Sequence, residues 1–229
     1  MLLIPIPTLI LLLLDVQYLS GVSLNTPMYA WEDPDPSNIF ISWILAVAQS
    51  PNPPMVISMS YGEYENLISD NNKQSWDTQA IKLGLQGVTL VVSSGDTGVS
   101  GQYAQPGAYN TTACGYASSF PASSPYVLSV GATQGYPIQV PSSCGSHGAI
   151  TTGGGFSQFY PTPSYQVQAN VIDDYFKNVE YQPYTDNSYI PSCPSCSSVI
   201  DGNFNSSNRG YPDLVAWSSF VNVIIGHYF

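Results

Sequence analysis

Basic side chains are scarce in this chain of 229 residues. Lysine and arginine together number only 4, against 15 aspartates and glutamates, which gives a formal net charge of −11 at pH 7. Binding to nucleic acid or to an anionic membrane needs lysine and arginine, so this composition argues against both partners. Because free carboxyl groups titrate near pH ~4, the acidic side chains repel one another least in an acidic compartment. The alternative is that the acidity only keeps a secreted protein soluble.

Histidine and cysteine are also rare, with 2 and 4 residues. A Ser-His-Asp triad is a poor interpretation, because His147 lies in a Gly/Ser-rich stretch and His227 lies close to the end of the sequence. The even number of cysteines fits disulfides in an oxidising compartment. Cys193-Pro-Ser-Cys196 could instead be half of a zinc site, but the other sulfur ligands are single and widely separated. We therefore expect no metal site.

Charged residues make up only 8% of the chain, whereas tyrosine, serine, glycine and proline are abundant. This composition is typical of extracellular proteins. Two glycosylation acceptor sequences, beginning at Asn110 and Asn205, agree with it. We therefore expect a glycoprotein that is secreted or lies in an acidic lumen.

The longest apolar run, Leu2–Leu14, is too short for a normal membrane span. It resembles the hydrophobic part of a signal peptide, but no lysine or arginine precedes it and no clear cleavage site follows it. We expect no membrane span.

Short apolar runs that alternate with a helical stretch predict a parallel sheet with helices, built from βαβ units. The expected strands are 55–60, 88–93 and 126–131, and the expected helices are 38–49 and 72–85. Ser37 can cap the first of these helices, Gly87 closes the second, and an earlier helix ends at Gly21. The region 134–208 is expected to be mostly loop.

The motif Ser94-Gly-Asp-Thr-Gly98 directly follows the expected strand 88–93. Ligands of open α/β sheets bind at the carboxyl ends of the strands, so the motif places the carboxyl group of Asp96 where a ligand would lie. The structural alternative is an aspartate that only caps a glycine turn.

Six blocks of sequence occur in a characteristic order. They are Leu14-Asp-Val-Gln-Tyr18, Ser60-Tyr-Gly62, Ser94-Gly-Asp-Thr-Gly98, Phe120–Val127 running into Val130–Thr133, Thr152–Ser157 with Pro163–Gln166, and Arg209–Asp213. This ordered set resembles the sedolisins, or serine-carboxyl peptidases, and within them the tripeptidyl-peptidase 1 type. The resemblance implies a partial peptidase domain over 14–216, between a divergent apolar N-terminus (1–13) and a divergent C-terminal tail (217–229).

The resemblance implies a subtilisin-like α/β fold, a parallel sheet flanked by helices, which is here incomplete at both ends. It also implies serine-type proteolysis at acidic pH, with a serine nucleophile, a glutamate general base and two aspartates. A carboxylate base suits acid, where a histidine would be protonated. By position, Asp96 matches the aspartate of the oxyanion hole and Asp15 the aspartate that orients the glutamate. Ser60, Tyr61 and Gly62 match the strand end that pairs with the substrate backbone.

Two features depart from the family pattern. Leu11 stands where the family has its glutamate, four residues before Asp15, and the sequence contains no Gly-Thr-Ser, the motif that carries the nucleophile. Both ends diverge abruptly around a well-matched middle, as an incomplete gene model would produce. We therefore expect this chain, as it stands, to be inactive as an enzyme. The alternative is a non-catalytic, secreted, peptide-binding protein.

The resemblance also implies the partners. The substrate would be a peptide or an unfolded protein, and an inhibitory pro-segment would be a further partner. We expect no cofactor in this chain, because the family builds its calcium site near a C-terminal part that this sequence does not match. The expected location is the lysosome or another acidic lumen, or the extracellular space.

Overall fold

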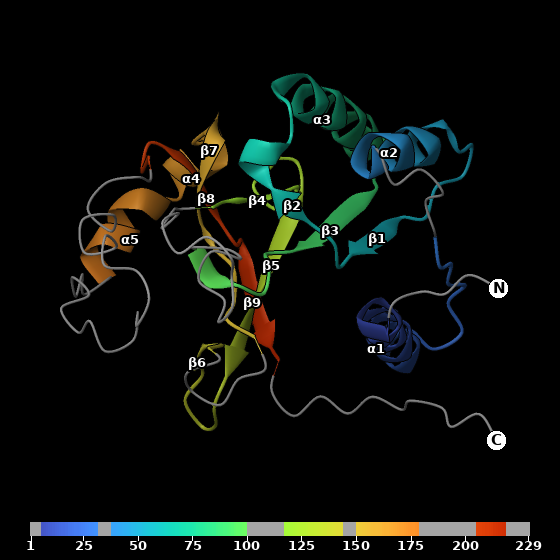
Figure 1. Cartoon of the computed structure of the whole chain (residues 1–229), viewed down its shortest axis with the longest axis horizontal. Helices are drawn as coiled ribbons and strands as arrows, with labels where there is room; N and C mark the ends of the chain where they lie inside the picture. Colours follow the sequence, from blue (N-terminus) through green and yellow to red (C-terminus); the bar gives the residue numbers. More distant parts are fainter. Residues whose placement is uncertain (1–5, 32–37, 100–116, 144–149, 179–204, 219–229) are drawn as a thin grey trace.

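The computed structural model describes residues 6–31, 38–99, 117–143, 150–178 and 205–218. Its main feature is a five-stranded sheet (Figure 1). The strands run in the order β1 (Val56–Met59), β3 (Thr89–Ser93), β5 (Leu128–Gln134) and β6 (Val140–Pro141), and β9 (Leu214–Trp217) pairs with β5. Strands β1, β3, β5 and β9 are parallel, and only β6 is antiparallel. The predicted α/β class and its parallel βαβ unit are therefore confirmed.

Two helices, α2 (Ile39–Gln49) and α3 (Asp70–Leu85), lie side by side above β1 and β3 (Figure 1). Ser69 caps α3 by accepting a hydrogen bond from the backbone N–H of Asn72 at 3.3 Å. The N-cap position of α2 is Asn38, whose side chain makes no capping hydrogen bond. The predicted cap, Ser37, lies outside the described residues. Both helices form close to the predicted bounds because each has an apolar face to bury.

The hydrophobic core lies between these helices and the sheet. Its fully or almost fully buried members include Ile44, Trp76, Leu83, Leu90, Val92 and Phe120. The indoles of Trp43 and Trp76 stack at 5.8 Å between ring centroids, which fixes α2 against α3. Alternation along β3 turns Leu90 and Val92 toward the core and leaves Thr89 exposed.

Two small antiparallel pairs flank the sheet. Strand β2 (Glu63–Tyr64), which leads into the short helix η1 (Glu65–Leu67), pairs with β4 (Ser119–Phe120). Strand β7 (Gly155–Pro161) pairs with β8 (Asn208–Tyr211), and α4 (Ser164–Gln168) and α5 (Val171–Asn178) follow β7. The prediction of mostly loop over 134–208 is wrong for β6, β7, α4 and α5. The partner of β7 follows about fifty residues later in the sequence, so a local pattern gave no sign of the pairing.

The described part of the N-terminal apolar run lies in one helix, α1 (Ile6–Val22), which continues one residue past the predicted end at Gly21. Figure 1 shows α1 apart from the sheet and from the other helices. Within the described ranges, the structure has no helix that is both long enough and apolar enough to cross a membrane.

Gly84, near the end of α3, offers a stabilising substitution. A Cβ added there would meet no atom within 4 Å, so Gly84→Ala introduces no clash. Alanine loses less backbone entropy than glycine on folding into a helix, so we expect the free energy of unfolding to rise by about 0.5 to 1 kcal/mol. Urea unfolding followed by circular dichroism measures this change. An unchanged or lower midpoint would contradict the open surroundings of this position.

Candidate active site

A pocket of about 330 Å³ opens at the carboxyl ends of β1 and β3. One wall is the segment 60–64 after β1, and the floor is the segment 93–98 after β3. The rest of the lining comes from Ala117, from Ser119 of β4, which pairs with Tyr64 of the first wall, and from Tyr211 at the end of β8. The structure therefore brings Ser60-Tyr-Gly62 and Asp96, which are separated by more than thirty residues in the sequence, into one pocket.

The wall formed by Ser60, Tyr61 and Gly62 is exposed. A Cβ on Gly62 would lie 2.8 Å from Ser119 Oγ and 3.2 Å from the carbonyl oxygen of Phe120, so the close packing of this segment against the neighbouring strand β4 requires glycine here. The ring of Tyr61 contacts Phe40 of α2 with 5.7 Å between centroids. The core below the pocket therefore helps to set the position of this wall.

The floor of the pocket is held by a second glycine-rich segment. The N–H of Gly153 donates to the carbonyl oxygen of Gly95 at 2.7 Å, and the N–H of Thr151 donates to the carbonyl oxygen of Asp96 at 2.9 Å. In return, Gly98 N–H donates to the carbonyl oxygen of Thr151 at 2.9 Å. Gly95 and Gly98 have φ angles of 105° and 66°, which glycine adopts without strain. These contacts fix the backbone on both sides of Asp96.

The side chain of Asp96 lies on the rim of the pocket and stays exposed to solvent. Partial desolvation by the surrounding protein raises the pKa of its carboxyl group above the ordinary value of 3.8. Its proton is therefore retained to a higher pH than in a free aspartate. A protonated carboxyl at this place can donate a hydrogen bond to an oxygen atom in the pocket.

Asp15 lies within α1 and is not among the residues that line the pocket. Leu11, in the position of the family's glutamate, precedes it by one turn in the same helix. Because α1 is apart from the sheet in Figure 1, the structure does not bring Asp15 to Asp96. The orienting role of Asp15 stays a prediction.

The structure describes only some of the other predicted sites. Asn205 is exposed, as a glycosylation acceptor must be, and its side-chain oxygen accepts from Ser207 N–H at 3.0 Å. Asn110, the four cysteines and both histidines lie outside the described residues. In the part of the chain that is described, no group of three or more metal-ligating side chains comes together. The expected disulfides, and the expectation of no metal or cofactor, stay predictions.

The pocket is also lined by residues that the sequence did not identify as site residues. Glu63 and Tyr64 directly follow the Ser60-Tyr-Gly62 block, so their position in the sequence could have identified them as pocket residues. Ser119 and Tyr211 are joined by a hydrogen bond of 2.8 Å from Ser119 N–H to Tyr211 Oη. This pairing links positions that are 92 residues apart and has no local signature.

Comparisons with known proteins agree in pointing to one group. Residues 24–216 match the Peptidase S8 subtilase family. Tripeptidyl-peptidase 1 of Bos taurus is 32% identical over 218 residues, covering 93% of this chain and 34% of the relative. Aorsin of Aspergillus oryzae is 36% identical over 185 residues, covering 76% of this chain and 27% of the relative. The chain thus spans about a third or less of the length of these curated relatives.

One solved structure is also similar, a Pseudomonas sedolisin described as a serine-carboxyl proteinase complexed with two molecules of pseudo-iodotyrostatin. It has a TM-score of 0.49 and 24% sequence identity, and the likeness covers 81% of this chain and 43% of that one.

Proposed function

The chain belongs to the subtilase family, among its sedolisin-type, tripeptidyl-peptidase 1-like members, and on this premise we propose that it supplies the peptide-binding strand and the oxyanion-hole carboxyl of an acid-acting serine peptidase. The observation that carries the proposal is the pocket in which Ser60-Tyr-Gly62 and Asp96 meet. The substrate class is a peptide or an unfolded protein chain. A pro-segment that occupies the same pocket would act as an inhibitor.

Each wall of the pocket has a part in this proposal. An extended peptide lies along the exposed segment Ser60–Gly62 and pairs with it through backbone hydrogen bonds. The carbonyl group of the peptide then faces Asp96 on the pocket rim. A protonated Asp96 donates a hydrogen bond to that carbonyl oxygen and would stabilise the negative charge that develops there during acyl transfer.

The 229-residue polypeptide on its own is proposed to bind peptides without cleaving them. Leu11 cannot act as a general base in place of glutamate, and no Gly-Thr-Ser motif is present to supply the nucleophile. Incubation at about pH 4.5 with a peptide that carries a fluorescent leaving group is expected to release no fluorescence above the buffer rate. Measurable turnover that survives repurification would contradict this part of the proposal.

The same departures favour a second candidate, a secreted peptide-binding protein that has lost catalysis. The transcript across both ends of the coding sequence separates the two. A glutamate four residues before Asp15 in a longer reading frame, together with a downstream Gly-Thr-Ser, would support the peptidase. The absence of both would support the binding protein. The proposed location, an acidic lumen or the extracellular space, is the same for both candidates.

Replacing Asp96 by asparagine tests the carboxyl directly. We expect wild-type affinity for a fluorescein-labelled peptide of alternating alanine and phenylalanine to fall by about tenfold as the pH rises past the raised pKa of Asp96. The reason is that the ionised carboxylate no longer donates and repels the carbonyl oxygen. In Asp96→Asn the amide N–H donates at every pH, so the affinity should stay constant. Fluorescence anisotropy measures both, and equal pH profiles would contradict the assigned role.

A further inference from the structure

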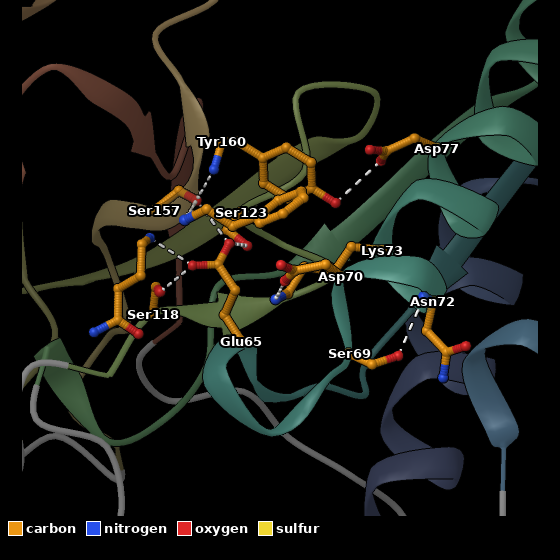
Figure 2. Close-up of polar contacts among 12 residues, drawn as sticks. Glu65, Ser69, Asp70, Asn72, Lys73, Asp77, Ser118, Ser123, Ser157 and Tyr160 are labelled. Carbon is orange, nitrogen blue, oxygen red and sulfur yellow. Dashed lines mark hydrogen bonds and ion pairs between the residues drawn. The ribbon is translucent and has the colours of Figure 1, made fainter.

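The carboxyl group of Glu65 is completely buried behind the pocket and accepts four hydrogen bonds (Figure 2). The hydroxyls of Ser118 and Ser123 each donate to it at 2.6 Å, and the hydroxyl of Ser157 donates at 2.7 Å. The fourth donor is the backbone N–H of Gln158, at 2.5 Å. The two oxygen atoms of a carboxyl group offer about four acceptor positions, so its capacity is filled.

The donors come from segments that are remote in sequence. Ser118 and Ser123 lie 53 and 58 residues after Glu65, on either side of β4, and Ser157 lies 92 residues after it on β7. Glu65 N–H also donates to the carbonyl oxygen of Ser118 at 2.8 Å. One side chain therefore ties η1 to β4 and β7.

Two of these contacts lie directly behind the pocket. Glu65 follows Glu63 and Tyr64, which belong to one wall. Ser118 stands between Ala117 and Ser119, which also line the pocket, and Ser119 is the strand partner of Tyr64. The bonds between Glu65 and Ser118 thus hold two adjacent parts of the pocket lining together from behind, in addition to the backbone pairing of β2 with β4.

Burying the carboxyl group lowers the free energy of unfolding relative to a packed apolar side chain, unless its hydrogen-bond partners are well placed. No cation offsets it among the described ion pairs, because Lys73 pairs with Asp70 and Arg209 pairs with Asp213. What such a network supplies is a fixed geometry, since hydroxyl donors at these distances allow little sliding of one segment past another.

We propose that Glu65 is a positioning residue for substrate, which fixes through Ser118 the part of the pocket lining that β2 and β4 form together. This inference rests on the proposed peptide-binding function. It predicts that peptide affinity depends on the contact between Glu65 and Ser118 more than on the other contacts of the same carboxyl group.

Ser118 and Ser123 form a matched pair for the test. Both are completely buried, and each donates one hydroxyl hydrogen bond of 2.6 Å to Glu65. We expect Ser118→Ala and Ser123→Ala to lower the urea midpoint by similar amounts. We expect Ser118→Ala to weaken binding of the labelled Ala-Phe peptide about fivefold, and Ser123→Ala to change it less than about twofold. Binding is measured at a temperature where circular dichroism shows both variants to be folded.

Glu65→Gln is the second variant, because its amide group replaces one of the two acceptor oxygens by a donor, and so opposes two of the four donors without changing the shape. We expect about tenfold weaker peptide binding in the folded protein. Affinity losses that follow the stability losses equally in Ser118→Ala and Ser123→Ala would overturn the positioning role and leave the proposed function standing. If wild-type protein does not bind the peptide, the proposed function fails, and the positioning role fails with it.

Discussion

Replacing Gly153 by alanine is expected to destabilise the folded chain by about 3 kcal/mol or more. A Cβ at this position would lie 2.0 Å from the carbonyl oxygen of Ser94, 2.6 Å from its carbonyl carbon and 3.1 Å from the Cα of Gly95. All three are backbone atoms, so no side-chain rotation can relieve the clash. The two segments would have to separate.

That separation would break contacts on both sides of the pocket floor. Gly153 N–H would lose its hydrogen bond to the carbonyl oxygen of Gly95, and Ser94 N–H, which donates to Val130 at 2.9 Å, would be displaced from β5. The backbone around Asp96 would move with them. We therefore expect Gly153→Ala to weaken peptide binding at about pH 4.5, in addition to lowering the urea midpoint.

Gly84→Ala is the matched control for this substitution. It adds the same methyl group to a glycine that has open surroundings, so it reports the effect of the amino-acid change without the clash. Opposite signs for the two changes would establish the close approach of the segments that contain Gly153 and Ser94. A Gly153→Ala protein that unfolds at the wild-type urea concentration would show that the segments do not approach so closely.

Local sequence patterns predicted the elements that depend on local physics. The strands around 56–59 and 89–93 are apolar runs bounded by breakers, and the helices over 39–49 and 70–85 carry apolar faces. Of the elements that the prediction missed, β7 is stabilised by its pairing with β8. Its existence depends on a contact between distant segments, and no window of a few residues carries that information.

The candidate site divides in the same way. The motif around Asp96 could be placed at a strand end from its sequence alone, and the structure has it there, in one pocket with Ser60–Gly62. Glu65 and its three serine partners gave no signal, because a glutamate and scattered serines are ordinary surface residues until a fold brings them together. Asp15 shows that a motif can be matched in the sequence although its side chain does not line the pocket, because the motif does not determine where its helix packs.

The second large effect is expected from Asp77→Asn, which should stabilise the protein at neutral pH and not at acidic pH. Asp77 lies on α3 and accepts hydrogen bonds from the hydroxyls of Ser124, at 2.9 Å, and Tyr160, at 3.2 Å; Figure 2 shows the bond to Tyr160. Burial outweighs these two bonds and raises the pKa of the Asp77 carboxyl from 3.8 to about 6. The folded protein therefore holds this proton more tightly than the unfolded chain does.

The direction of the pH dependence follows from that difference. Well below pH 3.8 Asp77 is protonated in both states and has no effect on stability. As the pH rises toward about 6, the unfolded chain releases the proton first, so the free energy of unfolding falls, and it stays lower at higher pH. A shift of this size corresponds to about 3 kcal/mol, and partial exposure of the side chain reduces the expected loss to about 1 to 3 kcal/mol.

Asparagine keeps the shape and an acceptor oxygen for Ser124 and Tyr160 but cannot ionise. We therefore expect wild type and Asp77→Asn to have similar urea midpoints near pH 4, and the variant to be more stable by about 1 to 3 kcal/mol at pH 7. Asp174→Asn, at an exposed position of α5, controls for the loss of one negative charge. A difference between wild type and Asp77→Asn that does not change with pH would exclude the ionisation of Asp77 as its cause. A difference that grows with pH would mean that the ionised Asp77 lowers the free energy of unfolding at neutral pH, a loss that is absent in acid, where the carboxyl group is protonated.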